Sequence, residues 1–241
     1  MSETLLDINL VTKKFGGFTA LSQVTTNVKQ GERFGLIGPN GSGKTTLINC
    51  ISGILQNDGG DIVFGGKNLQ GLLPHQRTRA GITRTFQIPR PFHTMTVIQN
   101  LQIPLEFISG AGKSQKEIAD EAMSILETMG MADKANEETS GLTQIELRKL
   151  ELARAIAAKP KLLVSDEAMA GLTGQEVDEV LQILFRFNEQ GMTIIMIEHI
   201  MRAVMQFSHR VICLDAGQLI AEGTPDEIVK DKDVERAYLG A

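Results

Sequence analysis

The sequence of 241 residues lacks several features that mark other classes of protein. No apolar run approaches the ~18 residues that cross a bilayer, so we expect no membrane-spanning segment. Residues 1–7 contain neither a basic stretch nor an apolar core, so we expect no signal peptide. A net charge of −5 at pH 7 argues against nucleic acid or an anionic membrane surface as the main partner. Together these absences favour a protein that works in the cytosol.

Cysteine is also scarce. The two cysteines, Cys50 and Cys213, lie far apart among apolar neighbours and have no metal-ligand spacing, so we predict buried free thiols. Hydrophobic residues make up 42% of the chain, and its length allows one large domain or a domain with a subdomain. We find no internal repeat and no low-complexity segment.

The strongest motif is a glycine-rich loop that follows the apolar stretch Arg33–Ile37 and matches G-x-x-x-x-G-K-[ST]. Its glycines let successive N–H groups point inward at phosphate oxygens, and the helix that follows adds its positive dipole end. Lys44 can reach the β- and γ-phosphates, and the Thr45 hydroxyl can bind Mg²⁺. The predicted nucleotide-binding residues are Gly38, Pro39, Asn40, Gly41, Ser42, Gly43, Lys44, Thr45 and Thr46.

The order of patterns along the chain predicts an α/β domain. Strand patterns dominate the first third, whereas the middle shows helical spacing after the capping-box sequences at 114–117 and 143–146. From residue 161 onward, continuous apolar strands alternate with helices, which is typical of a parallel sheet covered on both faces. We therefore predict one domain, 1–241, in which 1–90 and 161–241 form a nucleotide-binding core and 91–160 form an inserted helical subdomain.

Candidate catalytic residues stand at predicted strand ends, where open α/β sheets hold their ligands. Asp166 could hold Mg²⁺ through water, and Glu167 could orient the water that attacks the γ-phosphate. The alternative is a strand that simply ends in polar residues. His199 follows the next apolar strand and could contact the γ-phosphate. The Gln87 amide could reach Mg²⁺ or the attacking water, although its spacing alone is equally typical of a loop residue.

This order of motifs resembles that of the ATP-binding subunits of ABC transporters, and the resemblance covers the whole chain. It implies a P-loop NTPase core with a mostly parallel sheet, an N-terminal antiparallel β part and an inserted helical subdomain. It also implies ATP and Mg²⁺ as ligands, and Phe15 as the aromatic that stacks on adenine. The matching elements are Gly38–Thr45 for Walker A, Gln87 for the Q-loop, Leu162–Asp166 for Walker B, Glu167 for the catalytic glutamate and His199 for the H-loop.

Finer similarity lies with importers of branched-chain amino acids and their hydrophobic amino acid or amide relatives. The segments 81–87, 197–201 and 220–225 resemble that group. The resemblance implies an ATPase on the inner face of the plasma membrane, bound to permease subunits and served indirectly by a substrate-binding protein. The alternatives are an ABC ATPase of another system, such as lipopolysaccharide export, or a nucleotide-dependent switch without transport. A phosphate-loop kinase and a catalytically idle partner are further rivals. The transported molecule cannot be read from this chain.

Three positions depart from the family pattern. Ile145 replaces the second glycine of the signature, here Leu142–Glu146; Ala168 stands where proline is usual, and Thr173 where the D-loop has Asp or Asn. A β-branched side chain at 145 obstructs close approach to a phosphate across a dimer. We therefore expect a heterodimer with a second ABC ATPase subunit, the alternative being that Thr143 and the helix N-terminus suffice.

Overall fold

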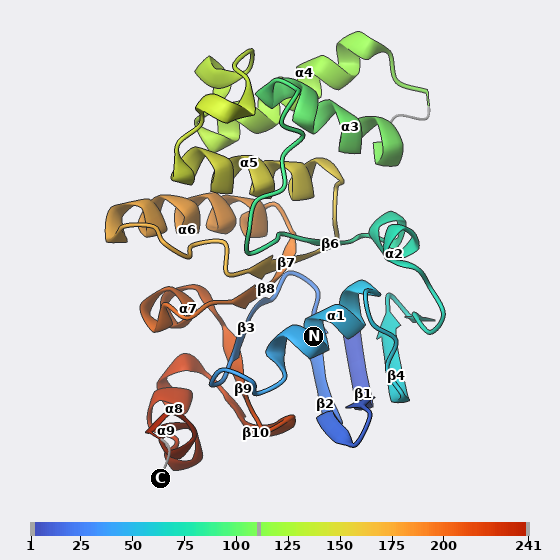
Figure 1. Ribbon diagram of the computed structural model, residues 1–241, viewed down its shortest axis with the longest axis vertical. Helices are drawn as coiled ribbons and strands as arrows, with labels where there is room; N and C mark the ends of the chain where they lie inside the picture. The colour runs from blue at the N-terminus through green and yellow to red at the C-terminus, as the bar shows by residue number, and fades with distance from the viewer. Residues whose placement is uncertain (1–2, 110–111, 240–241) are drawn as a thin grey trace.

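The computed structural model describes residues 3–109 and 112–239, which form two sheets and several groups of helices (Figure 1). The four-stranded sheet has the order β2-β1-β4-β5 and is antiparallel. Its strands are β1 (Thr4–Phe15), β2 (Phe18–Lys29), β4 (Gly59–Phe64) and β5 (Lys67–Asn68). The predicted antiparallel β part at the N-terminal end is therefore confirmed.

The six-stranded sheet has the order β10-β9-β3-β8-β7-β6. Its strands are β3 (Arg33–Ile37), β6 (Ile82–Arg84), β7 (Leu162–Asp166), β8 (Thr193–Ile197), β9 (Arg210–Asp215) and β10 (Gln218–Gly223). Every pairing from β9 to β6 is parallel, and β10 adds an antiparallel edge to β9. The sheet is mostly parallel, as predicted, and the carboxyl ends of β3, β7 and β8 meet at one edge.

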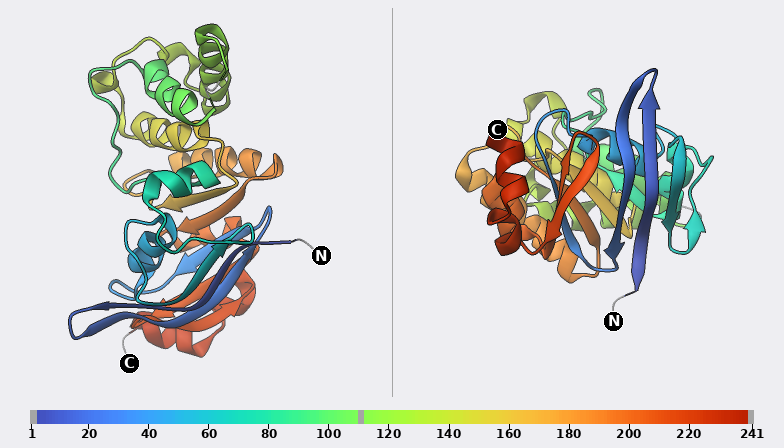
Figure 2. Two further views of the ribbon diagram at one scale, coloured as in Figure 1. Left: turned by 90° about the vertical axis from the view of Figure 1, so that its right-hand side faces the viewer. Right: turned by 90° about the horizontal axis from the view of Figure 1, so that it is seen from below.

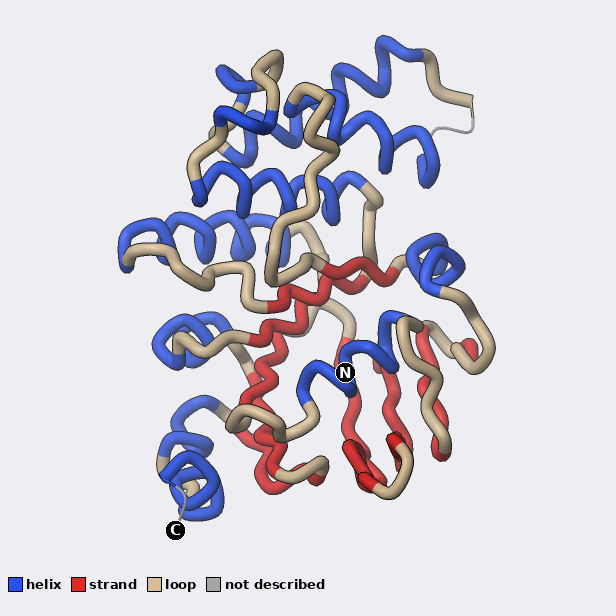
Figure 3. The backbone as a smooth tube through the Cα atoms, in the orientation of Figure 1, coloured by secondary structure: helices blue, strands red, loops and turns tan. Residues whose placement is uncertain are grey.

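The helices gather in separate groups, as the tube in Figure 3 shows. The group at the top of Figure 1 lies within the predicted insertion 91–160 and consists of α3 (Val97–Ser109), α4 (Gln115–Met129) and α5 (Gln144–Ala157). The short 3₁₀ helices Ala132–Lys134 and Thr139–Gly141 join α4 to α5. The remaining helices are α1 (Lys44–Ser52), α2 (Pro74–Ala80), α6 (Gly174–Glu189), α7 (Met201–Phe207), α8 (Pro225–Val229) and α9 (Lys232–Leu239).

The parallel sheet is buried on both faces, which explains its continuous apolar strands. In β8, Ile194 and Met196 point into a core shared with the helices α3 to α7, whereas Ile195 and Ile197 point into a core shared with α1 and the antiparallel sheet. The period of two along a strand produces this division. Helix α1, which begins in the phosphate loop, is thereby held between the two sheets (Figure 2).

The two thiols lie on opposite faces of the parallel sheet. Cys50 of α1 and Cys213 of β9 are free and fully buried, which confirms the prediction. Burial raises the pKa of each thiol to about 11. Both therefore pack as small apolar side chains and stay protonated near neutral pH.

Capping boxes fix the starts of four helices. The Ser114 and Thr143 hydroxyls accept hydrogen bonds from the N–H groups three residues later, as the sequence predicts, and the Thr224 hydroxyl does the same at the start of α8. Thr173 forms a fourth box with Glu176 at the start of α6. Sequence analysis missed helix α2, because its short polar sequence has no apolar period.

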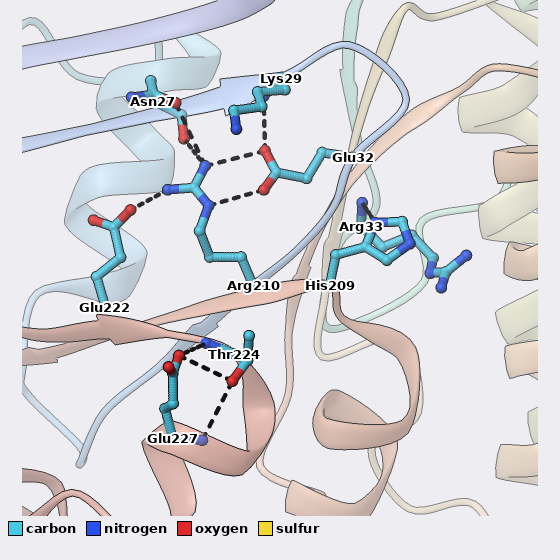
Figure 4. A network of polar contacts seen from close by, with 9 residues as sticks. All are labelled: Asn27, Lys29, Glu32, Arg33, His209, Arg210, Glu222, Thr224 and Glu227. Carbon is cyan, nitrogen blue, oxygen red and sulfur yellow. Dashed lines mark hydrogen bonds and ion pairs between the residues drawn. The ribbon is translucent and has the colours of Figure 1, made fainter. Parts of the chain in front are cut away.

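An arginine network fastens the two sheets together (Figure 4). Arg210 of β9 donates to Glu32, with a 2.9 Å contact from Nε to Oε1, and pairs also with Glu222 of β10. Its Nη2 donates to the Asn27 carbonyl of β2 over 2.5 Å. Glu32 in turn accepts the Lys29 amide at 2.7 Å. The network links the hairpin of β1 and β2 to the edge of the parallel sheet.

Candidate functional site

The glycine-rich loop connects β3 to α1 at the carboxyl edge of the parallel sheet, and two of its glycines have no substitute. Gly38 has φ 148°, and a Cβ there would lie 2.1 Å from the Leu214 carbonyl oxygen. Gly43 has φ 106°, and its Cβ would lie 2.8 Å from the Ala20 carbonyl oxygen. Both distances are below any real contact, so the loop closes tightly because these positions lack side chains.

Lys44 lies buried at the start of α1 and is held by its own loop. Its Nζ donates to the carbonyls of Gly38 and Pro39 at 2.7 and 2.9 Å. Burial lowers the pKa of Lys44, and the nearby carboxylates of Glu167 and Asp166 act in the opposite direction. The ammonium group therefore stands in a place where positive charge is poorly hydrated, which strengthens its attraction for an anion.

A pocket of about 330 Å³ opens over the loop. Phe15 and Phe18 form one wall, and their exposed fractions are 47% and 64%. The predicted aromatic Phe15 therefore presents a free face beside the phosphate loop, with Lys13 Nζ 5.6 Å from the centre of its ring. Phe18 was missed by sequence analysis, although it pairs with Phe15 across the hairpin. The other lining residues are Ala20, Asn40, Gly41, Ser42, Gly43, Lys44, Thr45, Thr46, Glu167 and His199.

Glu167 lies at the centre of a chain of hydrogen bonds. Its Oε1 is 2.9 Å from His199 Nε2, and its Oε2 accepts from the Gln87 amide. The structure thus brings together three predicted residues from the ends of β6, β7 and β8. Glu167 also has φ 48°, which is unusual for a residue with a side chain. Its amide is fixed to the Ile197 carbonyl at 2.9 Å, so the neighbouring strand holds this backbone in place.

Asp166 lies beneath Glu167 and is engaged by an arginine that sequence analysis did not single out. Arg84 Nη2 contacts Asp166 Oδ2 at 2.5 Å, and its Nη1 donates to Asn49 Oδ1 at 2.6 Å. The Asp166 amide donates to the Thr85 hydroxyl at 3.1 Å. Arg84 therefore joins β6, β7 and α1 around the predicted metal-binding carboxylate. Arg84 can reach Asp166 because β6 and β7 are adjacent strands in the sheet.

A third acidic residue, Glu198, lies behind the site. It is 3% exposed and accepts the Met169 amide at 2.9 Å. Burial, reinforced by the charges of Glu167 and Asp166, raises its pKa to about 7. The hydrogen bond from Met169 and the charge of Arg148 oppose the rise but do not cancel it. Glu198 thus retains its proton to a higher pH than an exposed glutamate does.

Comparison with known proteins decides the family. A family model described as ABC transporter matches residues 21–170. This chain belongs to that family. A second model, described as branched-chain amino acid ATP-binding cassette transporter, matches residues 218–241 of the cassette.

The relatives of this cassette are similar along its whole length. The high-affinity branched-chain amino acid transport ATP-binding protein LivG of Salmonella typhimurium is 39% identical, over 100% of this chain and 99% of its own. Its counterpart BraF of Pseudomonas aeruginosa is 35% identical with the same coverage. A solved nucleotide-free cassette of an ABC transporter superposes with TM-score 0.89 at 30% identity, over 99% of this chain and 100% of that one. The P-loop ATPase fold and ATP hydrolysis follow from this membership.

The altered signature segment of the cassette is tied to the segments of its own chain that carry Gln87 and Glu167. The Thr143 hydroxyl donates to Glu146 Oε2 at 2.9 Å within the capping box of α5. Further along α5, the Arg148 guanidinium donates to the Gln87 carbonyl and, at 3.0 Å, to the Ala170 carbonyl. Arg148 therefore connects the signature helix to the Q-loop and to the segment after Glu167. Sequence analysis did not single it out.

The residues predicted to hold Mg²⁺ supply part of the ligand set that the ion needs. The donor set is the Thr45 hydroxyl, the Asp166 carboxylate and the Gln87 amide, all of which offer the oxygen ligands that Mg²⁺ prefers. In the part of the chain that the structure describes, no group of three or more His, Cys, Asp or Glu side chains could hold a metal alone. The set suits an ion that shares its ligands with phosphates and water, as Mg²⁺ in ATPases does.

Proposed function

We propose that this cassette is the ATPase subunit of a membrane importer for branched-chain or other hydrophobic amino acids or small amides. The names of its full-length relatives support the class of cargo, and the C-terminal match at 218–241 supports it independently. The observation that carries the ATPase chemistry is the Glu167 carboxylate, held between the Gln87 amide and the His199 imidazole beside the phosphate loop.

The geometry supports a part in hydrolysis for each side chain of the site. Glu167 orients and polarises the attacking water, while His199 and Gln87 fix the carboxylate and contact the γ-phosphate region. Lys44 and the loop N–H groups stabilise the charge that develops on the phosphate oxygens. Mg²⁺ bound through Thr45 and Asp166, with Gln87 nearby, would neutralise charge on the β- and γ-phosphates. Phe15 supplies an apolar face on which adenine stacks.

The test of this function separates binding from turnover. Glu167→Gln keeps the size of the side chain but removes its charge, so ATP should bind normally while hydrolysis falls several-hundred-fold, equivalent to about 3–5 kcal/mol. Uptake of labelled leucine into cells or proteoliposomes that carry the complete transporter should fall in parallel. Glu189→Gln, an exposed carboxylate far along α6, is the matched control. Near-normal turnover in Glu167→Gln would remove that residue from the mechanism.

A groove beside the Q-loop is the proposed docking site of the permease. It has a volume of about 280 Å³ and is lined mainly by α2, β6, α3 and α5, including Phe86, Pro104 and Arg154. The connecting segment from Gln87 to Pro104 carries both exposed and buried apolar side chains. Ile88 is 74% exposed, whereas Val97 is fully buried in the helical part. Phe86 and Pro104 line the groove, which would receive a short helix of the permease.

The dimer partner is proposed to be a second, different ABC ATPase subunit. The elements that act within this chain's own site are present, whereas Ile145 and Thr173 alter the surfaces that would face the partner. Thr173 has a local role in addition, because its side chain caps α6. Thr143 is likewise engaged in a cap, which weakens the alternative that Thr143 and the helix N-terminus suffice to hold the phosphate.

The proposed place of the protein is the inner face of the plasma membrane, bound through the permease and served indirectly by a substrate-binding protein. Within residues 3–109 and 112–239, no helix has the length and apolar character to cross a bilayer. Attachment would therefore depend on the docking groove. The transported molecule would be selected by the permease and the substrate-binding protein.

A further inference from the structure

The C-terminal helix α9 reaches the phosphate loop through one side chain. The Gly38 amide donates to the Tyr238 hydroxyl at 2.9 Å, across 200 positions of sequence. Gly38 is the first residue of the loop and is buried. The Tyr238 hydroxyl in turn donates to Met201 Sδ, with 4.0 Å between the oxygen and the sulfur. Met201 begins α7, two positions after His199. One hydroxyl therefore contacts the first residue of the loop that leads to Lys44 and the first residue of α7, which follows His199.

The rest of α9 is lightly packed. Val234 is its buried apolar residue, whereas Leu239 beside Tyr238 is 74% exposed. A hollow of about 400 Å³ lies between α7, α8 and α9 and is lined by Met201, Met205 and Val229, among others. A helix that covers a hollow gains little from packing, so its polar contact with Gly38 contributes a large share of what fixes its position.

We propose that Tyr238 is a positioning residue for the phosphate loop, through which docking of the C-terminal helix and ATP binding are coupled. The hydroxyl restrains the Gly38 amide at the entry of the loop, and the N–H groups that receive phosphate lie only a few residues further on. By linkage, ATP binding then holds α9 in place, and displacement of α9 weakens ATP binding by the same factor. Contact with Met201 extends the restraint to the segment that carries His199.

The first test measures affinity. Tyr238→Phe removes the hydroxyl and keeps the ring, so binding of a non-hydrolysable ATP analogue should weaken about three- to tenfold, the range of one net hydrogen bond. Leu239→Ala alters the same turn of α9 at an exposed site away from Gly38 and is the matched control, with unchanged affinity expected. If Tyr238 had a purely structural role, Tyr238→Phe would lower the melting temperature of the protein. The affinity for the ATP analogue, measured about 20 °C below that melting temperature, would then equal that of the wild type.

The second test uses the composition of the chain. Tyr238 is its only tyrosine and it has no tryptophan, so its intrinsic emission reports on this side chain alone. Burial raises the pKa of Tyr238, as expected for a phenol that is partly withdrawn from water. Quenching of the emission by acrylamide should decrease when the ATP analogue binds, because nucleotide holds the ring against the loop. Quenching that is the same with and without nucleotide, or wild-type affinity in Tyr238→Phe, would overturn the proposal.

Discussion

Replacement of Glu198 by glutamine removes a carboxylate whose ionisation the fold opposes. The group is 3% exposed, and its pKa rises from 4.5 to about 7 on folding. At about 1.4 kcal/mol per pH unit, the difference amounts to about 3 kcal/mol. Glutamine keeps the oxygen that accepts the Met169 amide and carries no charge. The variant therefore reproduces the protonated form of Glu198 at every pH.

The sign of the effect follows from proton uptake. Between pH 4.5 and 7 the folded wild type retains a proton on Glu198 that the unfolded chain has released, so the wild type loses stability as the pH rises. Glu198→Gln has no such loss. The difference in unfolding free energy, variant minus wild type, should grow by about 3 kcal/mol from pH 4 to pH 8 and stay constant above that.

Urea unfolding at several pH values measures this difference directly. Glu235→Gln changes an exposed glutamate of α9 and should show no comparable growth with pH. A difference for Glu198→Gln that is the same at pH 4.5 and pH 8 would refute the reasoning. It would mean that Glu198 is ionised in the folded protein with its charge fully compensated, by Arg148 for example.

Four further predictions concern other parts of the molecule. Arg84→Met leaves the Asp166 carboxylate, 9% exposed, without its cation and should cost about 3–5 kcal/mol of unfolding free energy, most of which Arg84→Met/Asp166→Asn should restore. Lys44→Ala should weaken both nucleotide binding and hydrolysis, as measured by titration and phosphate release. Ile145→Gly should increase hydrolysis by this chain alone; strong cooperative hydrolysis by the unmodified chain, unchanged by the glycine, would contradict the heterodimer. Ile88→Asp should abolish transport but spare ATPase activity of the isolated subunit, whereas Leu10→Asp, at an apolar site on β1 that is also exposed, should affect neither.

Much of this protein is determined by local sequence. The phosphate loop is readable because its function depends on backbone conformation over a few consecutive residues, and Gly38 and Gly43 encode that conformation by lacking a side chain. Asp166, Glu167 and His199 were predictable because apolar runs fix where strands end, and the carboxyl ends of parallel strands share an edge. The capping boxes are local in the same sense, since donor and acceptor are three residues apart.

Contacts that depend on which elements become neighbours were decided by the tertiary structure. Arg84 meets Asp166 because β6 lies beside β7, although the two residues are 82 positions apart. The burial that shifts Glu198, and the approach of Tyr238 to Gly38 across 200 positions, likewise have no local signature. A residue's type limits the bonds it can form, but the packing of sheets and helices selects the partner. Sequence therefore located the groups that act on phosphate, and the tertiary structure supplied the groups that hold them.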